Sequence, residues 1–503
     1  MGLLNCRQGL LSGVDVSSIP ENDRVLSLDV GSSSVRAALH DASGDAVEGS
    51  EVKLEHEFDH TADGGATADA EGLLDLVARA IDGVLSRSPG APILCVAAST
   101  FWHSVLGVDR DGRPTTPILT WADRRAADAA GGLRDRLDEE AVHRRTGAPL
   151  HSSYWPAKLL WLENAASEGF RRTERWLSPA DYFYARLFGG PPTIGTSMAS
   201  ATGLYDQNRN RWDRETLDVL PADEAQLPAL SDEPRTGLLD EWAWRWPALA
   251  DIHWFPALGD GACSNVGSGC TGSDRLALMV GTSGAMRVLW KADAVEVPPG
   301  PWCYRADRQR FVMGGALSDG GNLVGWLRET LRLPGPEETE ELLARMEPDA
   351  HGLTFLPILN GERGPAWADR ANGTISGLAM SNTPMEILRA AMEAVAYRFA
   401  LIAEILEEAS PGDKQVIATG GGLLGSPTWT RIMADALGRP VTLSGVEEAS
   451  ARGAVLLALE ALGGTGIETR EVPLGETFEP DPESHEVYRE ALARQRRLYD
   501  AVL

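Results

Sequence analysis

The chain has 503 residues, of which 43% are hydrophobic and 24% charged, and its formal net charge is −27. This length exceeds a single hydrophobic core, so we expect at least two domains, and the acidic balance argues against a nucleic acid or an anionic membrane as partner. Five cysteines form no Cys-x-x-Cys pair and no apolar run approaches a membrane span, so we expect a protein of the reducing cytoplasm without a zinc site or disulfide framework.

The first ordered element is a pair of strands around a glycine turn. Residues 1–23 lack a signal-peptide core and are expected to form an N-terminal extension. Alternating apolar residues in LSLDVGSSSVRAAL (26–39) predict two strands joined by Gly31 to Ser34. The elements predicted to follow are a third strand ending near residue 57, a helix at 70–86 and a buried strand at 93–99.

The same pattern returns 250 residues later, in LALMVGTSGAMRVL (276–289). Six of the fourteen aligned positions are identical, where ordinary composition predicts about one. The second series is predicted to contain strands at 276–280, 285–290, 310–314, 415–419 and 440–444 and helices near 320–332, 384–409, 426–437 and 448–462.

Mixed sheets covered by helices and built twice imply an α/β protein with two lobes. We expect the boundary near 256–272, and ligands in a cleft between the lobes, at the carboxyl ends of strands. The expected division is an extension (1–23), an N-terminal lobe (24–265), a C-terminal lobe (266–463) and a tail with a helix (464–503).

The repeated turn has the properties of a phosphate-binding loop. Glycine lets the backbone approach an anion closely, and Ser32, Ser33, Thr282 and Ser283 add hydroxyl donors. Asp29 in the first copy could hold Mg²⁺ through its waters. Met279 takes its place in the second, where another carboxylate would repel phosphate. The alternative is a pair of ordinary tight hairpins, but a third glycine-rich strand end at 416–426 favours a nucleotide site.

The sequence contains neither a Walker A motif nor a dinucleotide fingerprint. From about residue 24 to 463 it instead resembles the actin-like ATPase (ribonuclease H-like) fold, and within it the FGGY family of carbohydrate kinases. The segments that carry the resemblance are TWADRR (120–125), KLLWL (158–162), GLTFLPILNGERGPAW (352–367), GTISGLAMSNTPMEILRAAME (373–393) and ATGGG (418–422). The resemblance implies an internally duplicated α/β fold of two lobes with a ligand cleft between them.

The resemblance also implies the cofactors ATP and Mg²⁺ and assigns three loops to them. The residues assigned to the nucleotide are Asp29, Gly31, Ser32 and Ser33 in the first loop, with Asp29 as the metal ligand, Gly281, Thr282 and Ser283 in the second, and Gly420, Gly421 and Gly422 at the adenosine.

Three charged residues near these loops have other expected roles. Arg287 could contact phosphate or simply point outward from a strand, and Glu362 with Arg363 is expected to form a buried ion pair that braces the lobes.

Phosphoryl transfer to an alcohol needs in-line positioning and a base for the hydroxyl proton. The candidate base is Asp260, between two glycines in FPALGDGACSNVG (255–267), where the two halves meet. Its alternative role is that of an ordinary turn residue. The family resemblance favours catalysis, because these kinases carry their catalytic Asp in such a segment just before the second phosphate loop.

A polyol ligand requires planar polar groups and an aromatic face. Trp121, Asp123 and Arg125 would point the same way from an extended segment, and His103 and Tyr154 could complete the pocket. Without the resemblance, core packing would be favoured for Trp121 and Tyr154, and a satisfied loop histidine for His103. Similar kinases line the sugar site with the segments that match His103, Trp121 and Asp123 to Arg125. Lys158 is expected to cap or snorkel rather than to act in catalysis.

DGACSNVG (260–267), TWADRR and SMASATGLYD (197–206) resemble the gluconate-kinase branch. We therefore predict D-gluconate as the acceptor, with Arg125 as partner of its carboxylate, and D-xylulose as the second candidate. Gly195 stands where relatives commonly place an Asp, which bears on specificity. The rival functions are an actin-like ATPase switch, which would not explain TWADRR, and a sugar-binding pseudokinase. The partners expected are small-molecule sugars or sugar acids, with a homodimer left open.

Overall fold

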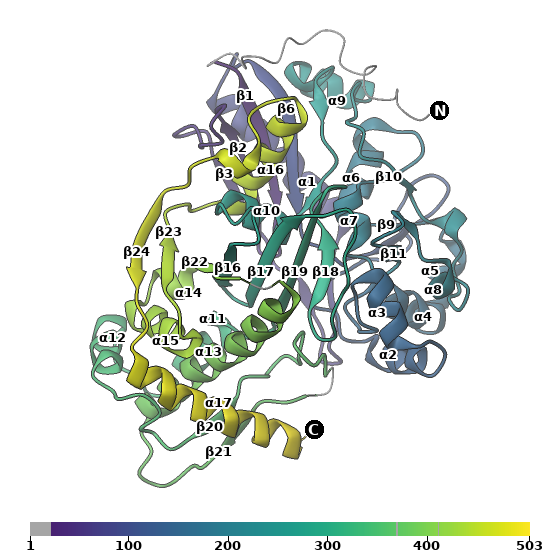
Figure 1. The fold of residues 1–503 in the computed structure, drawn as a ribbon. Coiled ribbons are helices and arrows are strands. Elements are labelled where there is room, and N and C mark those ends of the chain that lie inside the picture. The colour runs from purple at the N-terminus through teal and green to yellow at the C-terminus, as the bar shows by residue number, and fades with distance from the viewer. Residues whose placement is uncertain (1–21, 369–370, 411, 503) are drawn as a thin grey trace, which may run out of the picture.

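The computed structural model describes residues 22–368, 371–410 and 412–502 and shows two α/β lobes (Figure 1). The expected N-terminal extension therefore falls almost wholly outside the described residues. No helix among the residues that the structure describes is long and apolar enough to cross a membrane.

The N-terminal lobe is built on a sheet with the strand order β14-β6-β1-β2-β3, in which β15 also pairs with β6. Its first two strands form the predicted hairpin, and β1 is parallel to β6 on its other side. Helix α1 (Ala70–Arg87) packs against β2 and β3 and begins at Asp69, whose Oδ2 accepts from the N–H of Gly72. The strands are β1 (Arg24–Val30), β2 (Ser34–His40), β3 (Val52–Glu55), β6 (Ile93–Thr100), β14 (His253–Trp254) and β15 (Leu258–Gly259).

The C-terminal sheet repeats this arrangement with the order β18-β19-β17-β16-β22-β23-β24. Its first strand is again antiparallel to the second and parallel to a strand on its other side, so the duplication expected from the sequence is confirmed. The strands are β16 (Arg275–Val280), β17 (Gly284–Lys291), β18 (Trp302–Arg305), β19 (Arg310–Leu317), β22 (Gln415–Thr419), β23 (Val441–Ser444) and β24 (Leu474–Phe478).

The longest helix, α13 (Pro384–Ala409), lies across the core of this lobe. Thr383 and Glu386 form a capping box at its start, and Pro384 occupies the first turn, where its missing N–H costs nothing. The other helices in this half of the chain are α11 (Gly321–Thr330), α12 (Pro336–Ala344), α14 (Gly421–Leu424), α15 (Pro427–Leu437), α16 (Ala449–Ala461) and α17 (Pro482–Val502).

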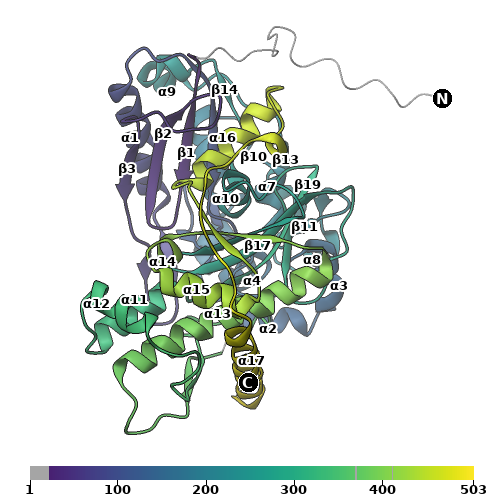
Figure 2. The same ribbon diagram turned by 60° about the vertical axis from the view of Figure 1, so that its left-hand side comes forward.

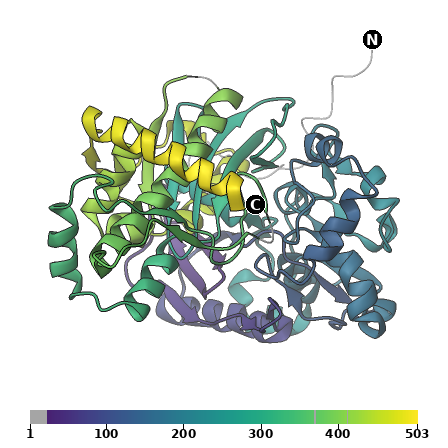
Figure 3. The ribbon, with the colours of Figure 1, turned by 90° about the horizontal axis from the view of Figure 1, so that it is seen from below.

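The residues assigned to a tail add two elements to the C-terminal lobe. Strand β24 pairs with β23, and α17 packs against α13 and α15 (Figure 3). Buried Tyr488 on α17 accepts a hydrogen bond from Arg389 on α13 at 2.8 Å. Residues beyond 464 thus complete the sheet and cover the core.

A largely helical region between β6 and β14 forms its own part of the molecule beside the two sheets (blue in Figure 3). Its helices are α2 (Ala127–Arg134), α3 (Glu139–Thr146), α4 (Trp155–Ala165), α5 (Ser167–Arg172), α6 (Pro179–Phe188), α7 (Thr196–Ser200), α8 (Arg214–Leu217) and α9 (Asp240–Arg245). The short paired strands outside the two main sheets are β4 (Asp59–His60), β5 (Ala66–Ala68), β7 (Leu106–Val108), β8 (Ile118–Leu119), β9 (Arg175–Leu177), β10 (Thr193–Ile194), β11 (Tyr205–Asp206), β12 (Arg211–Trp212), β13 (Ala229–Leu230), β20 (Thr354–Leu356) and β21 (Thr374–Ser376).

The two lobes meet where α10 (Asp260–Gly267) crosses α16, and α16 also contacts β1 and β6 of the other lobe (Figure 2). The crossing is close because glycine occupies both helices. A Cβ on Gly267 would lie 1.8 Å from the carbonyl oxygen of Ala449, and one on Gly453 would lie 1.8 Å from that of Cys263. The crossing fixes the start of α10 at the junction of the lobes.

Candidate active site

The two glycine turns, one from each lobe, face the same cavity. In the first turn the N–H of Gly31 donates to the carbonyl oxygen of Ser34, and in the second the N–H of Gly281 donates to that of Ser283, both at 2.9 Å. Ser32, Ser33, Thr282 and Ser283 all line one cavity of about 570 Å³. Two segments 250 residues apart are therefore brought together at one cavity.

Asp29 lies behind the first turn and is buried. Its Oδ1 accepts from the hydroxyl of Ser99 at 2.5 Å, and Arg36 lies 3.6 Å from its Oδ2. Burial raises the pKa of Asp29, while Ser99 and Arg36 favour the ionised form. Asp29 is not itself among the residues that line the cavity.

Asp260 is the first residue of α10 and lies between Gly259 and Gly261. Both positions require glycine because the indole of Trp102 leaves no room for a side chain. Built Cβ atoms would lie 1.7 Å from Cε2 of Trp102 at Gly259 and 2.6 Å from Cζ3 of Trp102 at Gly261. The indole thus fixes the backbone at the helix start, where the Asp260 carboxylate also accepts from the N–H of Gly261 at 2.7 Å.

The electrostatic surroundings of Asp260 suit a proton acceptor. Burial raises its pKa to about 6, with Asp29 adding to the rise and Arg287 and Arg363 opposing it. A carboxylate with this pKa is ionised at neutral pH and basic enough to accept a proton from an alcohol during transfer.

An aromatic cluster that the sequence did not reveal lies beside Asp260. Trp102 packs edge to face on Trp302 and Tyr304 of β18, at ring distances of 5.9 and 5.2 Å. Tyr304 forms a hydrogen bond with the hydroxyl of Tyr154, the residue before α4. Tyr154 was predicted as a polyol ligand; its buried hydroxyl is shared with Tyr304 instead of standing alone.

His103 stands at the edge of this cluster, at ring distances of 5.0 Å from Tyr154 and 5.4 Å from Tyr304. Its Nδ1 donates to the carbonyl of Ala201 at 2.6 Å, and burial lowers its pKa well below the usual value. The ring is therefore neutral, with Nε2 left as an acceptor. Lys158 donates to the carbonyl of His103 at 2.9 Å and so fixes the backbone of the loop that carries His103.

The TWADRR segment forms a turn rather than an extended strand, so its side chains do not share one direction. Trp121 and Arg124 line the cavity, whereas Asp123 and Arg125 do not. Arg125 is bound to Asp123, with Nη2 2.5 Å from Oδ2, and its guanidinium lies over the ring of Trp161.

The expected ion pair between Glu362 and Arg363 does not form. Glu362 is buried and pairs with Arg398 on α13, and it also accepts from the hydroxyl of Tyr499 at 2.5 Å. Both residues line the cavity, but Arg363 has a different neighbour: its guanidinium carbon lies 4.4 Å from the ring centre of Trp121. Neighbouring residues in an irregular segment point to different surroundings, which sequence adjacency does not reveal.

A second cavity, of about 540 Å³, adjoins the first at Thr282 and Asn322, which line both. It contains Gly281, Gly421 and Gly422, together with apolar side chains of α12, α13 and α15. Gly420 does not line it but forms the turn behind it. Its φ is 87°, and a Cβ there would lie 2.5 Å from the carbonyl oxygen of Val280. This cavity has the size and composition for a nucleoside next to the second turn.

Gly195, the departure noted in the sequence, lies at the start of α7 and lines neither cavity. Asp232 accepts from the N–H and the hydroxyl of Thr196, both at 2.7 Å, and so satisfies this helix start from another segment.

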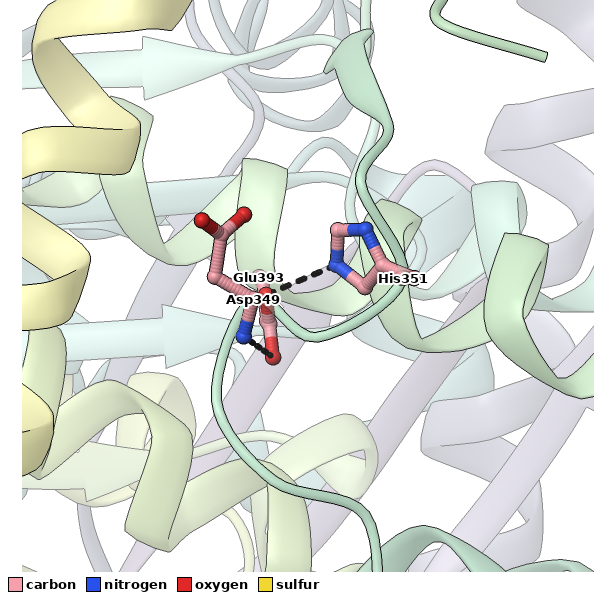
Figure 4. Close-up of side chains that lie close together, drawn as sticks. All are labelled: Asp349, His351 and Glu393. Carbon is pink, nitrogen blue, oxygen red and sulfur yellow. Dashed lines mark hydrogen bonds and ion pairs between the residues drawn. The ribbon is translucent and has the colours of Figure 1, made fainter.

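Asp349, His351 and Glu393 are close enough to suggest metal ligands (Figure 4). However, His351 Nε2 donates to Glu393 at 3.0 Å, because its Nδ1 accepts from the N–H of Leu353. Glu393 also pairs with Arg389 at 2.6 Å and Asp349 with Arg494 at 2.5 Å. These acids are already neutralised, so the group is a buried brace between α13, α17 and the loop before β20.

Comparison with known proteins gives a consistent result. The family models for the N-terminal and C-terminal domains of the FGGY family of carbohydrate kinases match residues 24–267 and 276–462. The gluconokinase of Bacillus subtilis is 27% identical over 458 residues, which cover 87% of this chain and 88% of that protein. The xylulose kinase of Staphylococcus xylosus is 24% identical over 439 residues, covering 86% and 90%.

Solved structures show the same similarity. A ligand-bound xylulose kinase from Lactobacillus acidophilus superimposes with a TM-score of 0.88 at 27% identity, covering 95% of this chain and 98% of that one. A gluconate kinase from the same organism gives a TM-score of 0.87 at 26% identity with the same coverage.

Proposed function

The chain belongs to the FGGY family of carbohydrate kinases and is therefore a phosphotransferase with an alcohol acceptor, and we propose that it transfers the γ-phosphate of ATP to a hydroxyl of D-gluconate. The observation that carries the proposal is the single cavity lined by both glycine turns together with Trp121 and Arg363. D-Xylulose is the second candidate acceptor, and relatives that are gluconokinases and xylulose kinases support this pair.

In this proposal the adenosine occupies the cavity beside Gly421 and Gly422, and the triphosphate extends between the two turns. Backbone N–H groups and the hydroxyls of Ser32, Ser33, Thr282 and Ser283 bind the phosphates. The chain has a net charge of −27, so such local donors are needed to hold an anion.

Asp29 is the residue proposed to hold Mg²⁺ through the waters of the ion, where the ion would neutralise phosphate charge. The donor set fits: one carboxylate oxygen of Asp29 accepts from Ser99, and the charge of Asp29 raises the pKa of Asp260, a second carboxyl group in the site. Two neighbouring carboxylates repel each other when both are ionised, and a divalent cation held by Asp29 would reduce this repulsion.

The acceptor is proposed to lie between Asp260 and Trp121, with its carbon chain along the aromatic residues. Asp260 takes the proton of the attacking hydroxyl as the phosphoryl group transfers. His103 Nε2 and the backbone around Trp121 are proposed to contact the remaining hydroxyls. Asp123 and Arg125, which bind each other, would orient the Trp121 turn rather than touch the sugar.

The decisive assay is ADP release with D-gluconate, D-xylulose, D-ribulose and glycerol as acceptors. We expect the highest kcat/KM with D-gluconate and little ADP release without an acceptor. ATP hydrolysis that is indifferent to every acceptor would indicate an actin-like switch, and no turnover with any acceptor would indicate a pseudokinase. A homodimer stays a prediction, which light scattering would test.

A further inference from the structure

Arg363 is a cation that lines the acceptor cavity. Its guanidinium stacks on Trp121, and its Nε is buried without a hydrogen-bond partner. Among the residues that the structure describes, no carboxylate forms an ion pair with it, and the adjacent Glu362 is taken by Arg398. The residue is half-buried, and a cation partly shielded from water without an anionic partner is unfavourable, so its place in a cavity points to an anionic ligand.

The groups that Arg363 faces define where in the cavity it stands. Burial lowers the pKa of Arg363, and the groups that oppose this are Tyr154, Tyr304 and Asp260. Asp260 is the only carboxyl group in this set, and it must stay available to receive a proton. The tyrosines belong to the aromatic cluster, so Arg363 lies on the acceptor side of the cavity.

Two anions can enter this cavity, the phosphates of the nucleotide and a carboxylate of the acceptor. Asp29, behind the first glycine turn, raises the pKa of Asp260 but is not among the groups that shift the pKa of Arg363. Arg287 lowers the pKa of Asp260 more than Arg363 does. It lies against Gly261, where its Nε would be 3.2 Å from a Cβ. Arg287 thus lies against the glycine that follows the base, whereas Arg363 stacks on Trp121 and lines the cavity.

We infer that Arg363 binds the carboxylate of a sugar acid, and that this contact makes the enzyme select acids over neutral sugars. The inference rests on the proposed function and names the residue that would determine its specificity. A guanidinium stacked on an indole presents its N–H edge outward, which suits bidentate binding of a carboxylate. The acceptor would extend from its reacting hydroxyl at Asp260 to its carboxylate at Arg363.

This assignment replaces the sequence-based choice of Arg125 as the carboxylate partner. Arg125 already has an anion, because both its Nε and Nη2 bind Asp123, and it lies over Trp161 outside the cavity. The two arginines thus differ in one respect that matters for binding: only Arg363 lines the cavity with its charge unpaired.

The test compares Arg363→Met, Arg363→Lys and the exposed control Arg332→Met, each checked for folding by circular dichroism and thermal unfolding. Steady-state kinetics are measured with D-gluconate, with other sugar acids, with neutral D-xylulose and with ATP varied. Arg363→Met should lower kcat/KM for the acid about 10- to 150-fold, as expected for loss of a charge-assisted hydrogen bond, with the KM for ATP unchanged. Xylulose should be affected less than threefold, Arg363→Lys should be intermediate, and Arg332→Met should match the wild type.

Equal losses on acid and neutral acceptors, or a raised KM for ATP, would overturn the inference and make Arg363 a phosphate or structural residue, while gluconate kinase activity of the wild type would stand. If the wild type instead uses another sugar acid and Arg363→Met loses that activity, the inference holds and the choice of gluconate fails. A wild type that accepts no sugar acid overturns both.

Discussion

Replacing Asp260 by Asn should stabilise the protein while removing its activity, because the ionised carboxylate is held in an unfavourable place. Burial raises the pKa of Asp260 from 3.8 to about 6, so at pH 7 its ionised form destabilises the fold by up to about 3 kcal/mol. Asn is similar in size, is uncharged at every pH and can still accept from the N–H of Gly261.

The sign of the effect depends on pH. Below about pH 4 Asp260 is protonated in both the folded and the unfolded chain, so the variant has no advantage. The advantage grows between pH 4 and pH 6 and is complete above pH 6, where the wild type ionises. For a chain of this length about 3 kcal/mol corresponds to a rise of about 3 °C in Tm.

The assay is thermal unfolding of the wild type, Asp260→Asn and the exposed control Asp251→Asn at several pH values from 4 to 8, beside ADP release at pH 7. We expect Asp260→Asn to release no ADP in response to an acceptor, to keep its affinity for ATP and to gain Tm only at the higher pH values. A variant with near-normal kcat, or one destabilised equally at every pH, would refute the assignment of Asp260 as a base with a raised pKa.

Three further predictions follow from the geometry. The wild-type kcat/KM should fall about tenfold between pH 7 and pH 5 as the catalytic carboxylate is protonated, and a flat profile would contradict this. Gly259→Ala would place a Cβ 1.7 Å from Trp102 and should cost about 1–3 kcal/mol of stability in chemical denaturation, whereas Gly131→Ala on α2, with open space around it, should be neutral or stabilising. Gly420→Ala would push against the carbonyl of Val280 from a φ of 87°, so the KM for ATP should rise in steady-state kinetics while the KM for the acceptor stays unchanged; the opposite pattern would speak against the nucleoside cavity.

Much of the fold follows from local sequence patterns. The duplicated hairpins and helix α13 lie at the residues predicted for them, because the sequence signals for these elements lie within short segments. Strand β24 was not predicted: its residues, LGETF, are mostly exposed and become a strand through pairing with β23. Such an element depends on tertiary contact rather than on its own pattern.

The residues of the site could likewise be predicted only in part from the sequence. The glycine turns and Asp260 carry their chemistry within a few residues, so the sequence could indicate them. Trp302 and Tyr304 could not be found, because their contact with Trp102 joins residues 200 positions apart. Glu362 pairs with Arg398, 36 residues further along the chain, and not with its neighbour Arg363. This pairing could not be read from the sequence either.

The central claim is that the two glycine turns bind one triphosphate between them. A crystal structure with Mg²⁺, a non-hydrolysable ATP analogue and D-gluconate tests it most directly. We predict phosphates between residues 29–34 and 281–284, with the acceptor hydroxyl at Asp260. A triphosphate bound anywhere else would contradict the account.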